Sequence, residues 1–177
     1  MRIIVFGLFL LRKIPSPPFG DKAKEGQLRG CCWKEHLARC ANENYALDTS
    51  AILTLRDDEP GAEQVAEFLY QAQDGKITVL ICFITLMETF YRVWKDEGEQ
   101  EGRLAYEQVQ SLPVSIIHES KSLLEQAAVL KATYRLSLAD AWIGAMAIQE
   151  GAILVHKDPE FDALQCRQIT LPYKEKL

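Results

Sequence analysis

Cysteine and histidine are scarce in this chain, which has five cysteines and three histidines among 177 residues. Three of the cysteines lie before residue 43, and the spacing Cys32-x3-His36-x3-Cys40 fits no common zinc knuckle or finger. Cys82 lies in an apolar run and is predicted to be a small buried hydrophobe. With neither a disulfide framework nor a convincing zinc set, we expect a protein of the reducing cytoplasm.

The sequence also lacks an apolar run long enough to span a membrane as a helix. Residues 3–11 form an apolar run of nine, whereas a spanning helix needs about 20 residues. Basic residues follow at once without a small-residue cleavage site, which argues against a secretory signal. Residues 15–30 are rich in proline, glycine and lysine and resemble a linker. We expect residues 1–43 to be an extension outside the fold and residues 44–177 to form one domain.

Positive charge is scarce in the predicted domain. Residues 1–43 carry eight Lys or Arg against four Asp or Glu, a net of +4, whereas residues 44–177 carry twelve against twenty-one, a net of −9. An acidic body argues against binding of a nucleic-acid backbone through a broad basic surface. It remains compatible with an acid-lined site that holds a cation, because the cation can bridge two negative partners.

Short apolar strands alternate with helical stretches along the domain. Strands are predicted at 44–47, 77–81, 113–117, 152–155 and 169–171, and helices at 52–56, 62–72, 85–94, 104–112, 120–134 and 138–148. Thr85 is expected to cap the third helix, and the charged residues 95–102 to form a break after it. The alternation predicts an α/β fold with a largely parallel sheet.

Asp140 stands out because it lies in a strongly apolar segment. From Leu138 to Ile148 almost every residue is apolar or small, which predicts a helix buried over most of its surface. Ser137 is positioned to cap this helix, and Asp140 then falls in its first turn, where amides and the helix dipole favour a negative charge. A buried carboxylate otherwise needs a partner or a metal. Asp140 therefore either extends the cap or belongs to an acidic site.

Three other acids are expected at the same edge of the sheet. Ligands of parallel α/β sheets bind at the carboxyl ends of the strands, where Asp48 follows the first strand and Asp158 the fourth. Glu88 and Asp140 lie near the starts of helices that can face this edge. Each acid alone fits a turn or a cap. Together they predict a cluster of four carboxylates.

Such a cluster predicts metal-dependent chemistry. Ionised carboxylates repel one another, so either some bind protons or a cation joins them. Oxygen ligands alone suit Mg²⁺ or Mn²⁺. A water held by the metal is a nucleophile for attack at phosphorus, and a second ion can stabilise the leaving oxygen. Thr49 and Ser50 are predicted either to hold a phosphate or orient Asp48, or to cap the turn that follows.

Four segments resemble the PIN domain of VapC-type toxins, and each carries one of the acids. They are residues 45–51 (YALDTSA), 85–91 (TLMETFY), 136–147 (LSLADAWIGAMA, the most specific) and 153–161 (ILVHKDPEF). The resemblance, over residues 44–172, implies a three-layer α/β/α sandwich with about five short strands. It also implies a Mg²⁺-dependent endoribonuclease that forms a homodimer and is blocked by a small antitoxin. The catalytic, metal-binding residues would be Asp48, Glu88, Asp140 and Asp158, supported by Thr49, Ser50, Ser137 and Glu160.

Two residues depart from the family pattern. His156 stands where the family usually has Thr, and we expect a surface residue at the end of a strand in preference to a base or hydrogen-bonding group. Glu160 stands where Asp is frequent, so its carboxylate reaches further.

Residues around the second acid have two interpretations each. Phe90, Tyr91 and Trp94 are predicted to lie in the core or on a dimer surface, with base stacking as the alternative. Arg92, Lys95, Arg103 and Lys157 are either solvated surface residues or contacts for RNA.

Other functions remain as alternatives to a toxin. They are a stand-alone PIN nuclease of RNA processing and a non-catalytic module that binds RNA or protein. A phosphatase of the haloacid-dehalogenase type would need a second Asp at the position of Ser50. A receiver-type phosphoacceptor would leave Glu88 and the Asp140 helix unexplained.

Overall fold

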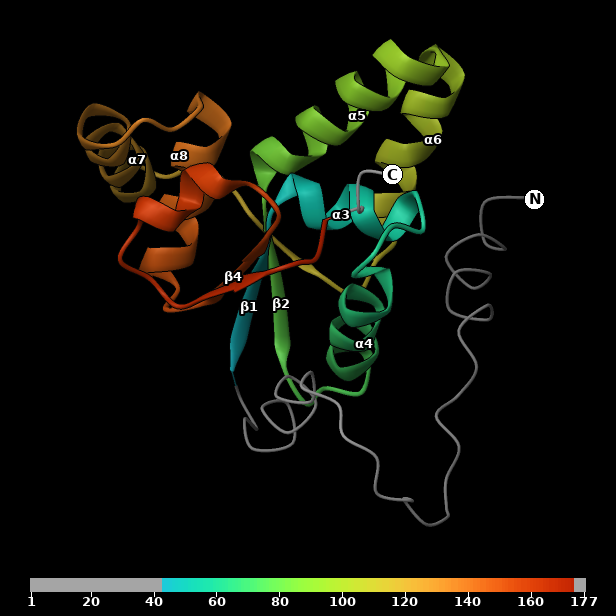
Figure 1. Cartoon of the computed structure of the whole chain (residues 1–177), viewed down its shortest axis with the longest axis horizontal. Helices are drawn as coiled ribbons and strands as arrows, with labels where there is room; N and C mark the ends of the chain where they lie inside the picture. Colours follow the sequence, from blue (N-terminus) through green and yellow to red (C-terminus); the bar gives the residue numbers. More distant parts are fainter. Residues whose placement is uncertain (1–42, 174–177) are drawn as a thin grey trace.

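The computed structural model describes residues 43–173, in which five strands form one parallel sheet (Figure 1). The strands are β1 (Asn44–Leu47), β2 (Thr78–Cys82), β3 (Ser115–Ile117), β4 (Ile153–His156) and β5 (Gln168–Thr170). Their order in the sheet is β3-β2-β1-β4-β5, and every neighbouring pair is parallel. The predicted α/β class and parallel sheet are confirmed. The central pair β1 and β4 brings together segments more than a hundred residues apart in the sequence.

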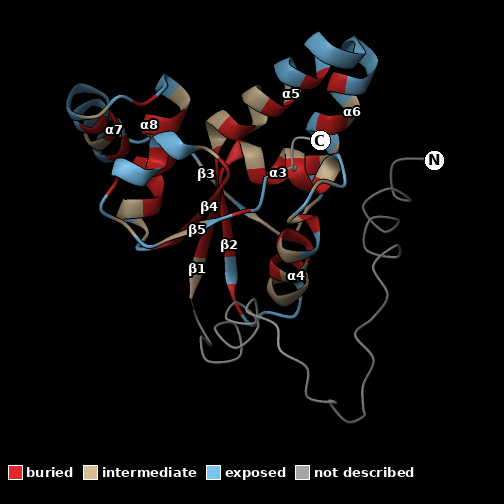
Figure 2. Cartoon of the chain, in the orientation of Figure 1, coloured by how far each residue is buried: buried red, intermediate tan, exposed pale blue. Residues whose placement is uncertain are grey.

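Helices cover both faces of this sheet, so the predicted three-layer sandwich is confirmed. The helices are α3 (Thr49–Arg56), α4 (Ala62–Gln73), α5 (Phe83–Glu97), α6 (Glu99–Gln110), α7 (Lys121–Thr133) and α8 (Leu138–Gln149), with a short 3₁₀ helix η1 (Pro159–Ala163). Alternate residues of the strands point to opposite faces. Tyr45 and Leu47 pack with α3 and α4, whereas Ala46 packs with α7 and α8. The central strands are buried on both faces (Figure 2).

Helix α8 is buried over most of its length, as its apolar sequence predicted (Figure 2). It packs against α7 and also contacts β1, β2 and β4. Gly144 lets Leu164 approach closely, since a Cβ at Gly144 would lie 2.6 Å from Leu164 Cδ1. Because α8 is packed over most of its length, its first turn is held in a fixed place at the edge of the sheet.

Two predictions about α5 are wrong. Thr85 is not a cap, because the helix begins at Phe83 directly after β2, with Cys82 in the cap position, and Thr85 is fully buried inside it. Residues 95–102 are not an extended break either. Only Gly98, at a φ of 103°, separates α5 from α6, and the two helices pack together as a hairpin (Figure 1). Helix α5 also contacts α3 and α8, so it bridges the two helical layers.

Two predictions concern residues that the structure does not describe. The extension 1–43, apart from Glu43, and the Cys32/His36/Cys40 spacing lie outside the described residues. Within residues 43–173, no helix is long and apolar enough to cross a membrane.

Gly102 sets how closely the α5–α6 hairpin packs, which gives a test of the fold. A Cβ at Gly102 would lie 2.8 Å from Trp94 Cβ and 2.9 Å from the Phe90 carbonyl oxygen. We expect Gly102→Ala to lower the free energy of unfolding by about 1–2 kcal/mol, because the overpacking cost exceeds the gain in helix propensity. Gly144→Ala is the comparison, since the flexible end of Leu164 can move away. Thermal unfolding that ranks Gly102→Ala as the more stable variant would contradict this packing.

Candidate active site

Asp48 lies at the carboxyl end of β1 and caps α3. Its Oδ2 accepts hydrogen bonds from the Ser50 amide, at 2.9 Å, and from the Ser50 hydroxyl. The same hydroxyl oxygen accepts a hydrogen bond of 2.9 Å from the Lys157 amide at the end of β4. Asp48 is only 3% exposed. Burial raises the pKa of Asp48, and the Ser50 hydrogen bonds oppose this while the nearby Glu88 charge adds to it. Ser50 therefore orients Asp48, which is one of the roles that the sequence suggested for it.

Glu88 lies in the second turn of α5 and is held by a residue of α3. The Thr49 hydroxyl donates a hydrogen bond of 2.6 Å to Glu88 Oε2. Burial raises the pKa of this half-buried carboxyl. The Thr49 hydrogen bond and Arg92 lower it, whereas Asp140 and Asp158 raise it. The Thr49 hydroxyl therefore holds the Glu88 carboxylate in place.

Asp140 is both a capping residue and a member of the cluster. Its amide donates to Ser137 Oγ at 3.1 Å, and the Ser137 amide donates back to Asp140 Oδ2 at 3.3 Å, which is a capping box. Asp140 is 8% exposed. Burial raises the pKa of Asp140, the Ser137 hydrogen bonds oppose this, and the Asp48 and Asp158 charges add to it. The two interpretations of Asp140 are therefore compatible.

Asp158 and Glu160 lie on the turn that follows β4. Asp158 caps η1, since its Oδ1 accepts a hydrogen bond of 2.8 Å from the Glu160 amide. The exposed Glu160 reaches across to α8, where its Oε2 accepts a hydrogen bond of 3.0 Å from the Ser137 amide. Because Asp140 accepts from the same amide, η1 and the start of α8 are linked directly.

These side chains surround one open cleft of about 450 Å³ between α5, the start of α8 and η1. The residues that line it are Glu88, Tyr91, Arg92, Lys95, Asp96, Ser137, Asp140, Asp158 and Glu160. Asp48 does not line the open cleft, but the Glu88 charge raises the pKa of Asp48 and the Asp48 charge raises the pKa of Asp140. The structure therefore brings three of the four predicted acids into one cleft, with the buried Asp48 close enough to interact with two of them.

The donor set fits a hydrated hard cation better than zinc. Among the described residues, no group of three or more Asp, Glu, His or Cys side chains is placed to hold a metal ion. Mg²⁺ does not need three protein ligands, because it keeps several waters and is commonly held by one or two carboxylates. The nearby Cys82 is an unsuitable ligand, since burial raises the pKa of its thiol to about 11. The donor atoms available in the cleft are therefore carboxylate oxygens, the type of ligand that Mg²⁺ and Mn²⁺ prefer.

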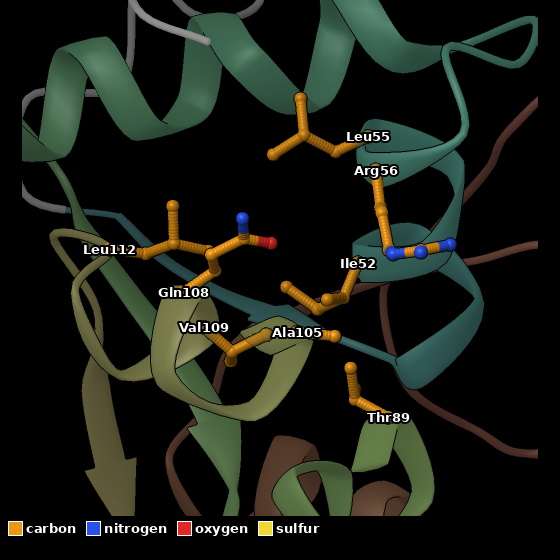
Figure 3. Close-up of a pocket in the computed structure, with 8 residues that line it drawn as sticks. All are labelled: Ile52, Leu55, Arg56, Thr89, Ala105, Gln108, Val109 and Leu112. Atoms are coloured by element: carbon orange, nitrogen blue, oxygen red, sulfur yellow. The ribbon is translucent and has the colours of Figure 1, made fainter. Parts of the chain in front are cut away.

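A second hollow, of about 30 Å³, lies between α3, α5 and α6 and differs in chemistry (Figure 3). Its lining residues are Ile52, Leu55, Arg56, Thr89, Ala105, Gln108, Val109 and Leu112. Most are apolar and none is acidic, and the Arg56 guanidinium is paired with Glu97 at 2.6 Å. This hollow is therefore no candidate for the same chemistry.

The sequence prediction for His156 is wrong. We expected a surface residue at a strand end, but His156 is 0% exposed because β5 pairs with β4 up to this residue and covers it. A strand order that places β4 inside the sheet would have signalled this burial. The buried Lys157 pairs with Glu59 at 2.9 Å, and the exposed Arg103 pairs with Glu99 at 2.7 Å, so both cations already have an acidic partner.

The raised pKa values of the acids give a prediction for stability. The folded protein binds more protons than the unfolded chain between the ordinary and the raised carboxyl pKa, so these groups make metal-free stability fall as pH rises through that window. A divalent cation bound by the ionised acids should restore the stability that the metal-free protein loses at neutral pH. At 100 times its Kd, Mn²⁺ would add about 2.7 kcal/mol, which is roughly 5–10 °C in Tm.

Asp140→Asn separates the two effects in a thermal-unfolding experiment. Without metal the variant should be at least as stable as the wild type at neutral pH, because one buried like charge is removed and the Ser137 amide keeps an acceptor. Its gain from Mn²⁺ should shrink to about half or less. An equal gain in both proteins would show that the cation binds elsewhere.

Comparison with known proteins agrees with this fold. A family model described as the PIN domain matches residues 45–165, and a search of curated proteins finds no match. A toxin–antitoxin complex from Klebsiella pneumoniae is similar at 24% identity and a TM-score of 0.53, covering 73% of this chain and 98% of that chain. VapBC2 from Rickettsia felis, bound to a promoter DNA fragment, is similar at 20% identity and a TM-score of 0.60, covering 73% of this chain and 99% of that chain.

A third similar structure is VapC20 from Mycobacterium tuberculosis, described as a toxin that cleaves the sarcin–ricin loop. It is 21% identical with a TM-score of 0.57, covering 71% of this chain and 98% of that chain. Likenesses at these identities establish a shared fold, whereas the family model spans more than half of the sequence. The chain therefore belongs to the PIN domain family, and its fold is that of the VapC-type members.

Proposed function

We propose that this protein is a Mg²⁺- or Mn²⁺-dependent endoribonuclease that hydrolyses RNA phosphodiester bonds. The observation that carries the proposal is that Glu88, Asp140 and Asp158, from three separate segments of a PIN domain, line one open cleft. The fourth acid, Asp48, is buried and its charge raises the pKa of Asp140. Asp48, Glu88, Asp140 and Asp158 are the proposed catalytic and metal-binding residues. Such a cleft, acidic and open to solvent, suits a substrate that approaches together with its cations.

The side chains around the acids would orient them as metal ligands in this mechanism. When bound, a divalent ion would supply an acidified water and neutralise charge on the phosphate. The chain orients the ligands: Ser50 holds Asp48, Thr49 holds Glu88, and Ser137 holds Asp140. Because these ligands are fixed before substrate arrives, little reorganisation accompanies the reaction.

Two cations in the cleft are suited to contact RNA. Arg92 and Lys95 line it on the α5 side, and neither forms a direct ion pair with a described residue. Tyr91, on the same wall and exposed, offers a face for an unpaired base. Two cations of this kind would add attraction for a phosphate backbone at the cleft without a broad basic surface.

We further propose that the protein is the toxin of a toxin–antitoxin pair, acting in the cytoplasm as a homodimer. Support comes from the similar toxin–antitoxin complexes and from an exposed apolar face on the α5–α6 hairpin. Met87, Tyr91, Trp94 and Tyr106 are exposed there. Phe83, Leu86 and Phe90 line an adjoining groove of about 550 Å³. Exposed apolar side chains that lie together are a common feature of protein contacts, which fits a partner antitoxin or a second copy.

Cleavage of a defined single-stranded RNA tests the enzymatic proposal. We expect cleavage with Mg²⁺ or Mn²⁺, none in excess chelator, and at least a hundredfold slower cleavage by Asp140→Asn, because a metal ligand is lost. Asp162→Asn is the matched control, since Asp162 is an exposed acid of η1 that does not line the cleft. It should cleave at the wild-type rate.

The outcomes separate the candidate functions. Cleavage that persists in chelator, or equally in Asp140→Asn, would overturn the metal-nuclease proposal. Binding of RNA without cleavage under any metal would favour the non-catalytic module. Metal-dependent cleavage without a neighbouring gene for a small DNA-binding protein would favour a stand-alone nuclease of RNA processing.

A further inference from the structure

We propose that His156 is a positioning residue that holds the turn carrying Asp158 in its metal-binding place. The inference rests on the proposed function, because it assigns a task to His156 at the same acidic cleft. His156 does not line the cleft. It acts through Asp158, two residues further along the chain.

The first observation is a hydrogen bond from the ring to the backbone of Asp158. His156 is the last residue of β4 and is fully buried. Its Nδ1 lies 2.8 Å from the Asp158 carbonyl oxygen. A carbonyl oxygen can only accept, so Nδ1 carries the proton and donates. The ring therefore closes the turn from β4 into η1 directly behind the fourth acid.

The second observation is that Gln168 of β5 fixes the other side of the ring. The Gln168 amide nitrogen donates to the carbonyl oxygens of Phe161, at 3.0 Å, and Leu164, at 2.9 Å. Because the amide nitrogen points at these two carbonyl oxygens, Gln168 Oε1 faces the ring, where it lies 2.9 Å from His156 Nε2. Both ring nitrogens therefore face oxygen atoms, and the contact at Nε2 is a hydrogen bond when Nε2 also carries a proton. The ring also packs edge-on against Phe161, with centroids 5.1 Å apart.

These contacts fix Asp158 at two points. Its carbonyl oxygen is held by His156, and its side chain is held by the Glu160 amide at 2.8 Å. Glu160 in turn reaches the Ser137 amide at the start of α8. The histidine thus ties together β4, η1 and β5 and, through η1, the start of the Asp140 helix. A metal ligand displaced by as little as 1 Å loses much of its effect, so the ring should control metal affinity.

Two substitutions divide the ring into its two hydrogen bonds. In His156→Asn the side-chain amide nitrogen takes the place of Nδ1 and can still donate to Asp158. In His156→Gln the amide nitrogen takes the place of Nε2, which keeps the contact with Gln168 and loses that with Asp158. Both variants lose part of the ring packing against Phe161. A purely structural role would therefore affect both variants alike.

Mn²⁺ affinity of the full-length protein, measured by titration calorimetry without RNA, is the deciding experiment. We expect His156→Asn to bind Mn²⁺ within about threefold of the wild type and His156→Gln to bind at least tenfold more weakly, in line with the cost of losing outer-shell support. RNA cleavage at a Mn²⁺ concentration near the wild-type Kd should follow the same order. If His156→Gln does not fold, His156→Leu replaces it, with the same expectation of weak binding.

Each outcome decides between the proposals. Equal Mn²⁺ affinity in the Asn variant and in the Gln or Leu variant, whether both retained or both weakened, would overturn the role of His156 alone. A wild type that binds no Mn²⁺ would overturn both this role and the metal-nuclease proposal. A wild type that binds Mn²⁺ but cleaves no RNA would overturn the nuclease proposal and leave the positioning role to be judged by the ranking of the variants.

Discussion

Mutual repulsion among four carboxylates is the constraint on which the rest of this structure depends. The four acids are Asp48, Glu88, Asp140 and Asp158. The charge of each one raises the pKa of at least one other, and burial raises the pKa of the first three. Such an arrangement costs stability unless something opposes it. The cleft is therefore held together by the surrounding fold and not by attraction among its own groups. A divalent cation is the partner that this arrangement favours, because it converts the repulsion into ligation.

The fold opposes the repulsion with helix ends. Asp48 caps α3, Asp140 belongs to the capping box of α8, and Asp158 caps η1. Three of the four acids thus accept hydrogen bonds from backbone amides at the starts of helices, where a negative charge is favoured. Glu88 is the exception, since it lies within α5 and depends on the Thr49 hydroxyl. The same amides fix the acids before a metal arrives, so the features that stabilise the metal-free protein also orient the ligands.

Much of this site was predictable from local sequence, and the remainder depended on strand order. Asp48 and Asp158 were recognisable because each follows an apolar strand, and Asp140 because it interrupts an apolar helix. His156 was misjudged because only the pairing of β5 with β4 covers it. Thr85 was misjudged because α5 follows β2 without a polar cap. The link from Thr49 to Glu88 joins residues 39 apart and leaves no mark in sequence spacing. Local pattern predicts which acids are present, whereas packing decides what holds them.

A metal site formed by these acids is tested most directly by the position of Mn²⁺ in crystals of the full-length protein, located by anomalous scattering. We expect a peak in the cleft between α5, the start of α8 and η1, with oxygen atoms of at least two of the four acids as ligands and water completing the shell. A well-ordered Mn²⁺ bound elsewhere, with none in the cleft at millimolar concentration and neutral pH, would contradict it.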